Sequence, residues 1–272
     1  MKKVLSIAGS DCSGGAGIQA DLKTFSAHGV FGMTAIVSVV AENTARVIDI
    51  MNVSPEMIGE QIDAVYEDIV PDAVKVGMLS AAPQMEAVAA KLIEHGSVNV
   101  VIDPVMFAKN GDPLMDFGSI DTLIEKILPL ADVLTPNIPE AEHIAKMKVE
   151  TTGDMEKAAE IIHAMGCRNV LIKGGNHIPD AQDLLFDGST HHHFKTRYIE
   201  TQSTHGTGCT YSSAIASNLA IGYPVEEAVR RAKDYVTTAI EHAPNIGHGC
   251  GAVHHFWDLY RDGLQNAARE DY

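Results

Sequence analysis

The sequence predicts an α/β protein, a three-layer sandwich in which a mainly parallel β-sheet lies between two layers of helices. Short apolar segments alternate with longer segments whose apolar residues recur every three or four positions. Apolar strands separated by helices are typical of a parallel sheet that is covered on both faces. The chain has 272 residues, 46% of them hydrophobic, and no long linker, so we expect one domain over residues 1–272.

In the first half of the chain, each expected strand is a short apolar run. These runs are Val4–Ala8, Thr34–Ala41, Ala73–Val76 and Val98–Ile102. The segments between them have helical spacing and cover residues 16–28, 54–69 and 85–96. Gly29 and Gly96 end two of these helices, while Ser54 and Pro55 give the third an N-cap and a first-turn proline.

The second half continues the alternation and adds a hairpin. Its expected strands are Val133–Thr135 and Val170–Ile172, followed by a hairpin of Leu184–Phe186 with Phe194–Ile199. Helices are expected over residues 120–127, 155–166, 209–219 and 225–240, the last of which has the clearest amphipathic pattern. In such a sheet a ligand binds beyond the carboxyl ends of the strands, so the polar loops there are the candidate site.

The composition limits the classes of partner and the location that we expect for the protein. The net charge of −16 argues against nucleic acid and anionic membranes, and no run of apolar residues is long enough for a membrane span. The first apolar run stops at Gly9 and Asp11 follows it, which is unlike a signal peptide. The four cysteines form no C-x-x-C pair, as expected of free thiols in a cytoplasmic protein.

The glycine-rich segment after the first strand allows two interpretations. Gly15-x-Gly17-x-x-Ala20, with Glu42 at the end of the next strand, imitates a dinucleotide fingerprint and would make the protein an NAD-dependent oxidoreductase. However, several polar residues separate the strand from these glycines. We therefore favour a loop whose backbone amides wrap a ligand, and a plain turn before a helix is the structural alternative.

A second glycine-rich segment, Gly206-Thr207-Gly208-Cys209, precedes a helix and predicts an anion hole. No P-loop motif occurs, but backbone N–H groups and a helix N-terminus can stabilise a transferring phosphoryl group. The same field lowers the pKa of a thiol, so we expect Cys209 to act as a base on an alcohol. The alternatives are a buried cysteine chosen for its size and a nucleophile paired with His205.

Three polar residues follow other expected strands. Asp103 and Glu140 are carboxylates at the same edge of the sheet, where they suit Mg²⁺, and Lys173 precedes two glycines and can reach phosphate. An Asp-Pro turn, a helix-cap glutamate and a solvated lysine are the structural alternatives. His191–His193 fit a surface hairpin, and His248, Cys250, His254 and His255 match no standard zinc spacing.

Eight segments carry a resemblance that covers nearly the whole chain. In order, they are G-S-D-C-S-G-G-A-G-I-Q-A-D-L-K-T-F, A-E-N-T, K-V-G-M-L, V-I-D-P-V-M, T-P-N-I-P-E-A, I-K-G-G, T-H-G-T-G-C-T and G-H-G-C-G-A-V-H-H-F. Together they resemble the ribokinase-like superfamily, and specifically the vitamin kinases that phosphorylate hydroxymethylpyrimidine and its monophosphate in thiamine synthesis. A cysteine at position 209, where most ribokinase-like sugar kinases have aspartate, is similar to these kinases and to some pyridoxal kinases.

The resemblance implies a role for each candidate residue. The amides of Gly206, Thr207, Gly208 and Cys209 would form the anion hole, and Cys209 would be the base. ATP would contact Lys173, Thr207 and Gly208, and Asp103 and Glu140 would organise Mg²⁺. The pyrimidine would lie among Gly9, Asp21, Glu42, Met78 and Val105. Family members are commonly homodimers, so a homodimer is expected.

Glu42 departs from the family, which usually has glutamine at this position. A glutamine amide both accepts and donates a hydrogen bond, whereas a carboxylate only accepts unless it or the ring nitrogen carries a proton. Either the pocket favours a protonated ring, or selectivity has shifted toward a pyridoxine-type ring. A pyridoxal, pyridoxine or pyridoxamine kinase is therefore the alternative function, with a non-catalytic ligand-binding protein as another class.

Overall fold

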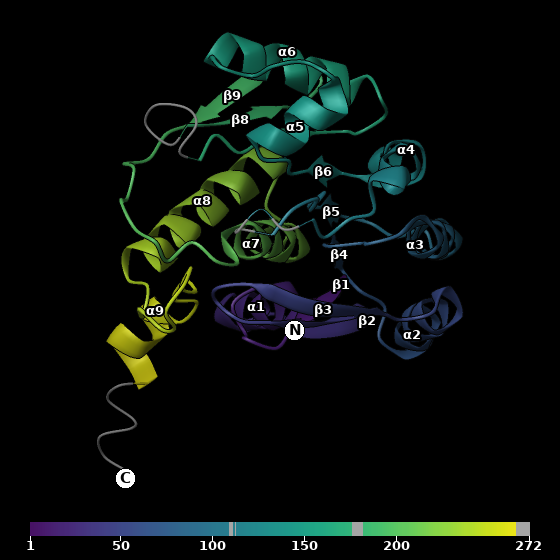
Figure 1. The fold of residues 1–272 in the computed structure, drawn as a ribbon, viewed down its shortest axis with the longest axis horizontal. Helices are drawn as coiled ribbons and strands as arrows, with labels where there is room; N and C mark the ends of the chain where they lie inside the picture. Colours follow the sequence, from purple (N-terminus) through teal and green to yellow (C-terminus); the bar gives the residue numbers. More distant parts are fainter. Residues whose placement is uncertain (109–110, 112, 176–181, 265–272) are drawn as a thin grey trace.

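A computed structural model describes residues 1–108, 111, 113–175 and 182–264. Its strands form one nine-stranded sheet in the order β3-β2-β1-β4-β5-β6-β7-β8-β9 (Figure 1). The strands are β1 (Lys3–Asp11), β2 (Phe31–Glu42), β3 (Val47–Asn52), β4 (Ala73–Val76), β5 (Val100–Ile102), β6 (Val133–Leu134), β7 (Val170–Ile172), β8 (Asp183–Phe186) and β9 (His191–Phe194). Neighbours from β2 to β7 are parallel, and β3, β8 and β9 add antiparallel edges.

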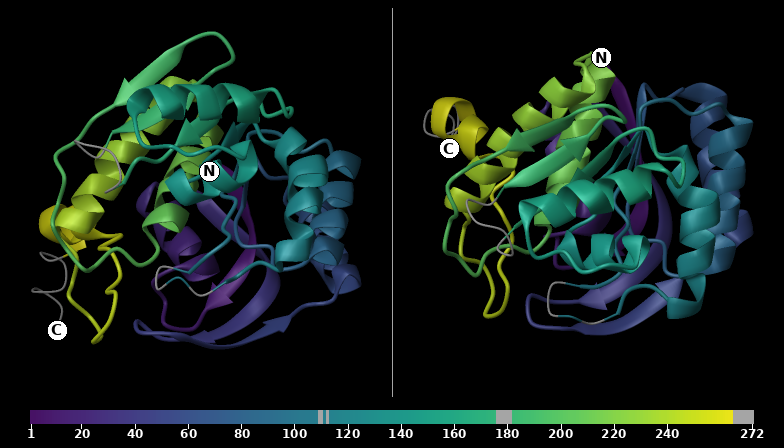
Figure 2. Two further views of the ribbon diagram at one scale, coloured as in Figure 1. Left: turned by 45° about the horizontal axis from the view of Figure 1, so that its top comes forward. Right: turned by 90° about the horizontal axis from the view of Figure 1, so that it is seen from above.

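Helices cover both faces of the sheet, which confirms the predicted three-layer α/β arrangement (Figures 1 and 2). One face carries α2 (Pro55–Asp68), α3 (Ala82–Glu94), α4 (Ile120–Thr122), α5 (Ile138–Ala145) and α6 (Thr152–His163). The other carries α1 (Gly17–Ala27), α7 (Thr207–Ile221) and α8 (Val225–Glu241). Leu5 and Ile7 of β1 join the first core and Val4 joins the second, so this strand is buried on both sides.

Several local signals operate as the sequence predicted. Ser54 Oγ accepts a hydrogen bond from the Met57 N–H, and Pro55 is the first residue of α2. Gly29 and Gly96, which the sequence placed at helix ends, follow α1 and α3 with the left-handed φ angles of 69° and 58° that glycine accommodates without strain. No helix among the described residues combines the length and apolar character needed to cross a bilayer.

Other elements differ from the prediction in their presence, their bounds or their helix type. β3 was not predicted, since it is an edge strand whose Ile48 and Met51 side chains are exposed. The hairpin exists, but its second strand is His191–Phe194 rather than Phe194–Ile199. The expected helix over residues 120–127 is helical throughout, but it begins as α4 and continues as a π-helical turn at Leu123–Ile127, with a 3₁₀ turn following at Leu128–Leu130.

Candidate active site

A cavity of about 770 Å³ lies at the carboxyl ends of the parallel strands, where the topology predicts a ligand. Loops after β1, β2, β4, β5, β6 and β7 line it together with the start of α7. Of the residues predicted for the site, the cavity brings together Gly9, Glu42, Met78, Asp103, Val105, Glu140, Lys173, Gly206, Thr207, Gly208 and Cys209. Asp21 alone of the predicted set is not among its lining residues.

The start of α7 has the geometry of an anion-binding turn. Gly206 precedes the helix with φ 75°, and a Cβ there would lie 1.7 Å from the Gly15 carbonyl oxygen. A Cβ on Gly208 would lie 3.2 Å from Asp103 Oδ2 and 3.5 Å from Lys173 Nζ, which places these side chains beside the turn. The Gly208 and Cys209 N–H groups find no backbone acceptor in the described part of the chain.

Cys209 differs from its expected chemical state. Burial raises the pKa of its thiol to about 11, although the nearby Lys75 ammonium acts in the opposite direction and the Gly17 N–H faces the sulfur. The expectation of a lowered pKa is therefore wrong, because desolvation outweighs the favourable field. The Cys–His nucleophile also fails, since His205 Nε2 lies 2.8 Å from an Asp11 carboxylate oxygen instead.

Lys173, Asp103 and Glu140 form one charged group at the cavity edge. Lys173 Nζ donates to Asp103 Oδ1 at 2.7 Å, and the Thr135 hydroxyl donates to the same oxygen at 3.1 Å. Glu140 also caps α5, where it accepts a hydrogen bond from the Asn137 N–H at 2.8 Å. The same side chain therefore both caps a helix and lines the cavity. Burial raises the pKa of Glu140 to about 7 despite the Lys173 charge. The carboxyl groups of Asp103 and Glu140 at one edge of the cavity fit a Mg²⁺ ion that keeps most of its waters.

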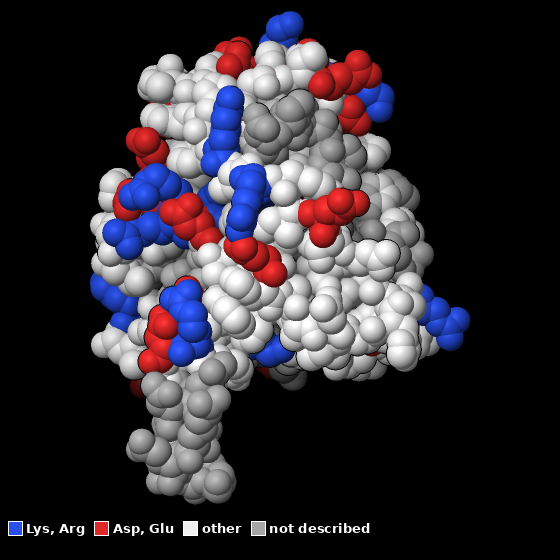
Figure 3. Space-filling model, turned by 90° about the vertical axis from the view of Figure 1, so that its left-hand side faces the viewer, with Lys and Arg blue, Asp and Glu red and all other residues white. Residues whose placement is uncertain are grey.

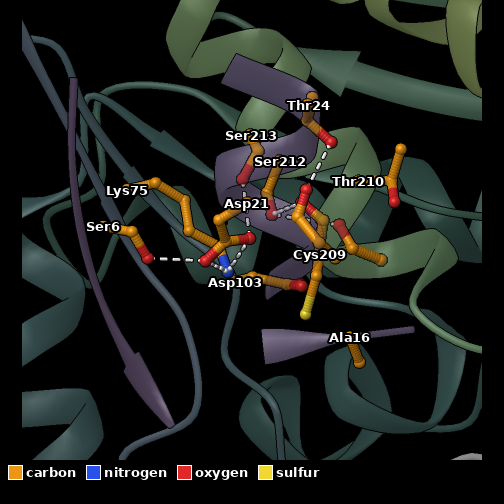
Figure 4. A network of polar contacts seen from close by, with 12 residues as sticks. Ser6, Ala16, Asp21, Thr24, Lys75, Asp103, Cys209, Thr210, Ser212 and Ser213 are labelled. Atoms are coloured by element: carbon orange, nitrogen blue, oxygen red, sulfur yellow. Dashed lines mark hydrogen bonds and ion pairs between the residues drawn. The ribbon is translucent and has the colours of Figure 1, made fainter. Parts of the chain in front are cut away.

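Asp21 lies beneath the cavity rather than in it. Its carboxylate accepts from Lys75 Nζ at 2.9 Å to both oxygens, and from the hydroxyls of Ser6 and Ser213 (Figure 4). The expected substrate contact is thus corrected to an ion pair between α1 and β4. Sequence reasoning missed Lys75, although a lysine inside the apolar run A-V-K-V requires a buried partner.

The loop after β1 is organised by Asp11 rather than by a ligand. The Asp11 carboxylate accepts from the N–H groups of Ser13, Gly15 and Ala16 at 2.7–3.0 Å. The expected amide-lined ligand loop is therefore wrong for these three amides, and the dinucleotide interpretation loses its pyrophosphate donors. Against the cost of burial, the bonds from His205, Ser13 and Ala16 hold the pKa of Asp11 well below its usual range.

The far end of the cavity uses residues that the sequence did not single out. It is lined by Arg197, Tyr198, Ile199, Val236, Thr237 and Ile240. Nearby, Lys233 Nζ donates to Asp183 Oδ2 at 2.7 Å, and Asp183 Oδ1 accepts from the Gly174 N–H at 3.0 Å. This pair links α8 to the loop that follows Lys173, and its signal was a lysine on the buried face of α8.

Among the residues that the structure describes, the histidine clusters do not converge on a shared site. His191–His193 form strand β9 of the surface hairpin, as predicted. His255 Nε2 lies 3.0 Å from the Thr210 hydroxyl, while His254 packs edge-on against Trp257. The Cys250 sulfur lies 3.4 Å from the Thr204 hydroxyl. These groups therefore act as separate packing and hydrogen-bonding residues.

Comparison with known proteins identifies the family. A family model described as phosphomethylpyrimidine kinase matches residues 11–254. The chain is 43% identical to the hydroxymethylpyrimidine/phosphomethylpyrimidine kinase of Staphylococcus aureus strain Mu50 over 268 residues, which is 97% of each chain. It is 48% identical to the thiamine biosynthesis bifunctional protein of Geobacter sulfurreducens, matching 93% of this chain and spanning 52% of that longer protein.

Solved structures agree with this assignment and with the ribokinase-like fold. The ADP complex of Bacillus subtilis pyridoxal kinase is 40% identical, with a TM-score of 0.88 over 94% of this chain and 98% of that one. Phosphomethylpyrimidine kinase from Clostridium difficile 630 is 42% identical, with a TM-score of 0.80 over 88% and 100%. The family match over most of the chain is decisive. This chain is a member of the phosphomethylpyrimidine kinase family.

Proposed function

We propose that the protein transfers a phosphoryl group from ATP to 4-amino-5-hydroxymethyl-2-methylpyrimidine, and then to the resulting monophosphate, in thiamine biosynthesis. The observation that carries this proposal is the turn before α7, where the Gly208 and Cys209 N–H groups, which bond to no backbone acceptor in the described part of the chain, lie beside Lys173 and Asp103. Backbone donors, a cation and a carboxylate in one cavity are what phosphoryl transfer requires. The Staphylococcus aureus relative is named as a kinase of both pyrimidines, and the Clostridium difficile relative as a kinase of the phosphomethylpyrimidine.

The catalytic contribution is mainly positioning and charge stabilisation. The Gly208 and Cys209 amides receive oxygens of the transferring group, and the Lys173 ammonium contacts the nucleotide phosphates after it leaves Asp103. Mg²⁺, held through its waters by Asp103 and Glu140, would neutralise charge on those phosphates. The residues form the donor set that this ion prefers, with oxygen ligands at the same edge as the anion hole.

Cys209 remains the proposed base for the hydroxymethyl group. With its pKa raised to about 11 the thiol holds its proton at neutral pH, so this role depends on nearby positive charge in the loaded site. A loose transition state keeps the alcohol proton in place until the bond to phosphorus is well formed, so the base acts late in the transfer.

The deciding assay measures ADP release with the pyrimidine, its phosphate and pyridoxal offered separately. We expect turnover of both pyrimidines. Turnover of pyridoxal alone would favour the alternative, a pyridoxal kinase, which the likeness to the Bacillus subtilis enzyme makes the most relevant competitor.

The charges and the exposed apolar side chains on the surface indicate which partners the protein binds. Lys and Arg side chains are interspersed with Asp and Glu on the face that includes α8, so that face offers no basic patch for nucleic acid (Figure 3). We propose a homodimer, supported by exposed apolar side chains on adjacent strands β2 and β3: Phe31, Val39, Ile48 and Met51. We also propose a cytoplasmic location, supported by the free state of all four cysteines.

A further inference from the structure

Three titratable side chains meet at the substrate end of the cavity. Asp11 ends β1, Glu42 ends β2, and His205 lies in the loop before α7. One polar atom from each lies within 4.8 Å of the others, and all three residues line the cavity. The segments that supply them are far apart in the sequence, so only the fold creates this group.

Within the group, Asp11 is already satisfied as an anion. Its carboxylate accepts three backbone N–H bonds and lies 2.8 Å from His205 Nε2. Although burial opposes a charged imidazole, the Asp11 carboxylate raises the pKa of His205. Since its oxygens are occupied by these donors, Asp11 is poorly placed to bind a cation, and the group is better described as an ion pair with a second carboxyl beside it.

Glu42 is that second carboxyl, and its surroundings favour the protonated form. Burial raises the pKa of Glu42 to about 7, and the adjacent Asp11 charge and hydrogen bond act in the same direction, while His205 opposes them. Two adjacent carboxyl groups cannot readily both ionise, and Asp11 has the better donors, so the proton resides on Glu42.

The loops that pack against Glu42 carry three further titratable groups, the side chains of Cys12, Arg46 and Cys250. The Cys12 thiol donates to the Glu42 carbonyl oxygen at 3.1 Å, and Arg46 and Cys250 line the same cavity. Arg46 comes from the turn after β2, and Cys250 from the loop whose N–H bonds to the Thr44 carbonyl. Of the charged groups here, Asp11 and His205 are those that act on Glu42.

A protonated carboxyl presents a hydrogen-bond acceptor and a donor side by side. A 4-aminopyrimidine presents the complement, an amino donor beside a ring-nitrogen acceptor. An ionised carboxyl would place a second acceptor against the ring nitrogen, unless that nitrogen takes up the proton. In either case one proton lies between Glu42 and the ring nitrogen. At high pH both groups are deprotonated before binding, so the complex must take this proton up from solution.

We propose that Glu42 determines specificity by binding the 4-aminopyrimidine edge through one shared proton, which makes substrate binding proton-linked. This inference rests on the proposed function, because it takes the aminopyrimidine as the substrate. A protonated Glu42 offers the same donor and acceptor as a glutamine amide, but the amide offers them without taking up a proton.

The test is the dissociation constant of 4-amino-5-hydroxymethyl-2-methylpyrimidine, measured by calorimetry from about pH 6 to about pH 9. For the wild type, it should rise by about tenfold per pH unit above about pH 7, because binding takes up one proton. Glu42→Gln should remove this slope, since the amide donor does not titrate in this range. Asp49→Asn removes an exposed carboxylate on β3 outside the cavity and should keep the wild-type slope.

A second measurement counts the proton directly. Calorimetry at about pH 8 in two buffers of different ionisation enthalpy should show uptake approaching one proton for the wild type and none for Glu42→Gln. Pyrimidine turnover with equal slopes and equal proton uptake in both proteins overturns this inference but leaves the proposed function intact. Turnover of pyridoxal without any turnover of the pyrimidine overturns the proposed function and, with it, the inference.

Discussion

The Lys75 ammonium lies 2.9 Å from both oxygens of the Asp21 carboxylate, and both side chains have no exposed surface (Figure 4). Lys75→Met should destabilise the protein by about 3–5 kcal/mol, because it leaves a buried carboxylate without its counter-charge. Urea unfolding measures the change. Lys91→Met, which removes a partly exposed ammonium paired with Asp63, should cost far less because water screens this pair. A similar small loss for both variants would contradict this account.

Cys209→Ala tests the proposed base. We expect kcat to fall by about 10²–10⁴-fold with little change in the KM for ATP, since the backbone amides of the anion hole remain. Steady-state kinetics with the pyrimidine measures both constants. Cys167→Ala is the matched control, because that buried thiol donates to the Leu128 carbonyl outside the cavity and should affect stability more than kcat. An unchanged kcat for Cys209→Ala would exclude the base role.

Lys173→Met tests the phosphate contact. The ammonium is held beside the anion hole by Asp103, so its loss should raise the KM for ATP by about tenfold or more, the effect of one charge-assisted bond. The KM for the pyrimidine should change far less. Lys148→Met removes an exposed lysine paired with Glu142 and serves as the control. Equal effects on both substrates would point to a general disturbance instead.

Asp103→Asn tests the magnesium site. The change keeps the shape of the side chain but removes the charge that faces Lys173 and the start of α7. We expect the Mg²⁺ concentration that gives half-maximal rate to rise by about tenfold or more at saturating ATP. Asp154→Asn, on an exposed helix cap, should leave this concentration unchanged. If the Mg²⁺ dependence of the two variants is the same, Asp103 does not hold the ion.

The pH dependence of stability probes Glu42 without any ligand. Burial first, and the Asp11 charge second, raise its pKa to about 7 in the folded protein. A raised carboxyl pKa contributes stability below the unfolded value of about 4.3, and that contribution is lost as pH rises through about 7. The wild type should therefore lose stability relative to Glu42→Gln between about pH 5 and about pH 8, as measured by urea unfolding. If the difference in the free energy of unfolding between the two proteins does not vary with pH, the pKa of Glu42 is not raised.

Most of the fold was predictable because it depends on local patterns. Apolar runs identified the buried parallel strands, and Ser54, Pro55 and the terminal glycines marked the helix ends. Edge strand β3 escaped prediction, since its exposed side chains leave no apolar run, and the second strand of the hairpin was placed too far along the chain. The candidate site was predictable where a loop motif follows a strand, as with Asp103, Lys173 and Gly206–Cys209, because parallel strands bring their carboxyl ends to one edge.

By itself, the sequence determined the α/β class, the edge of the sheet that carries the cavity, and most of the predicted residues that line it. Only the tertiary structure decided the charge states. It buried the Cys209 thiol and raised its pKa, paired Asp21 with Lys75, and set Glu42 against Asp11. The physical reason is that a local motif specifies backbone conformation, whereas a pKa depends on desolvation and on charges contributed by segments that are distant in the chain.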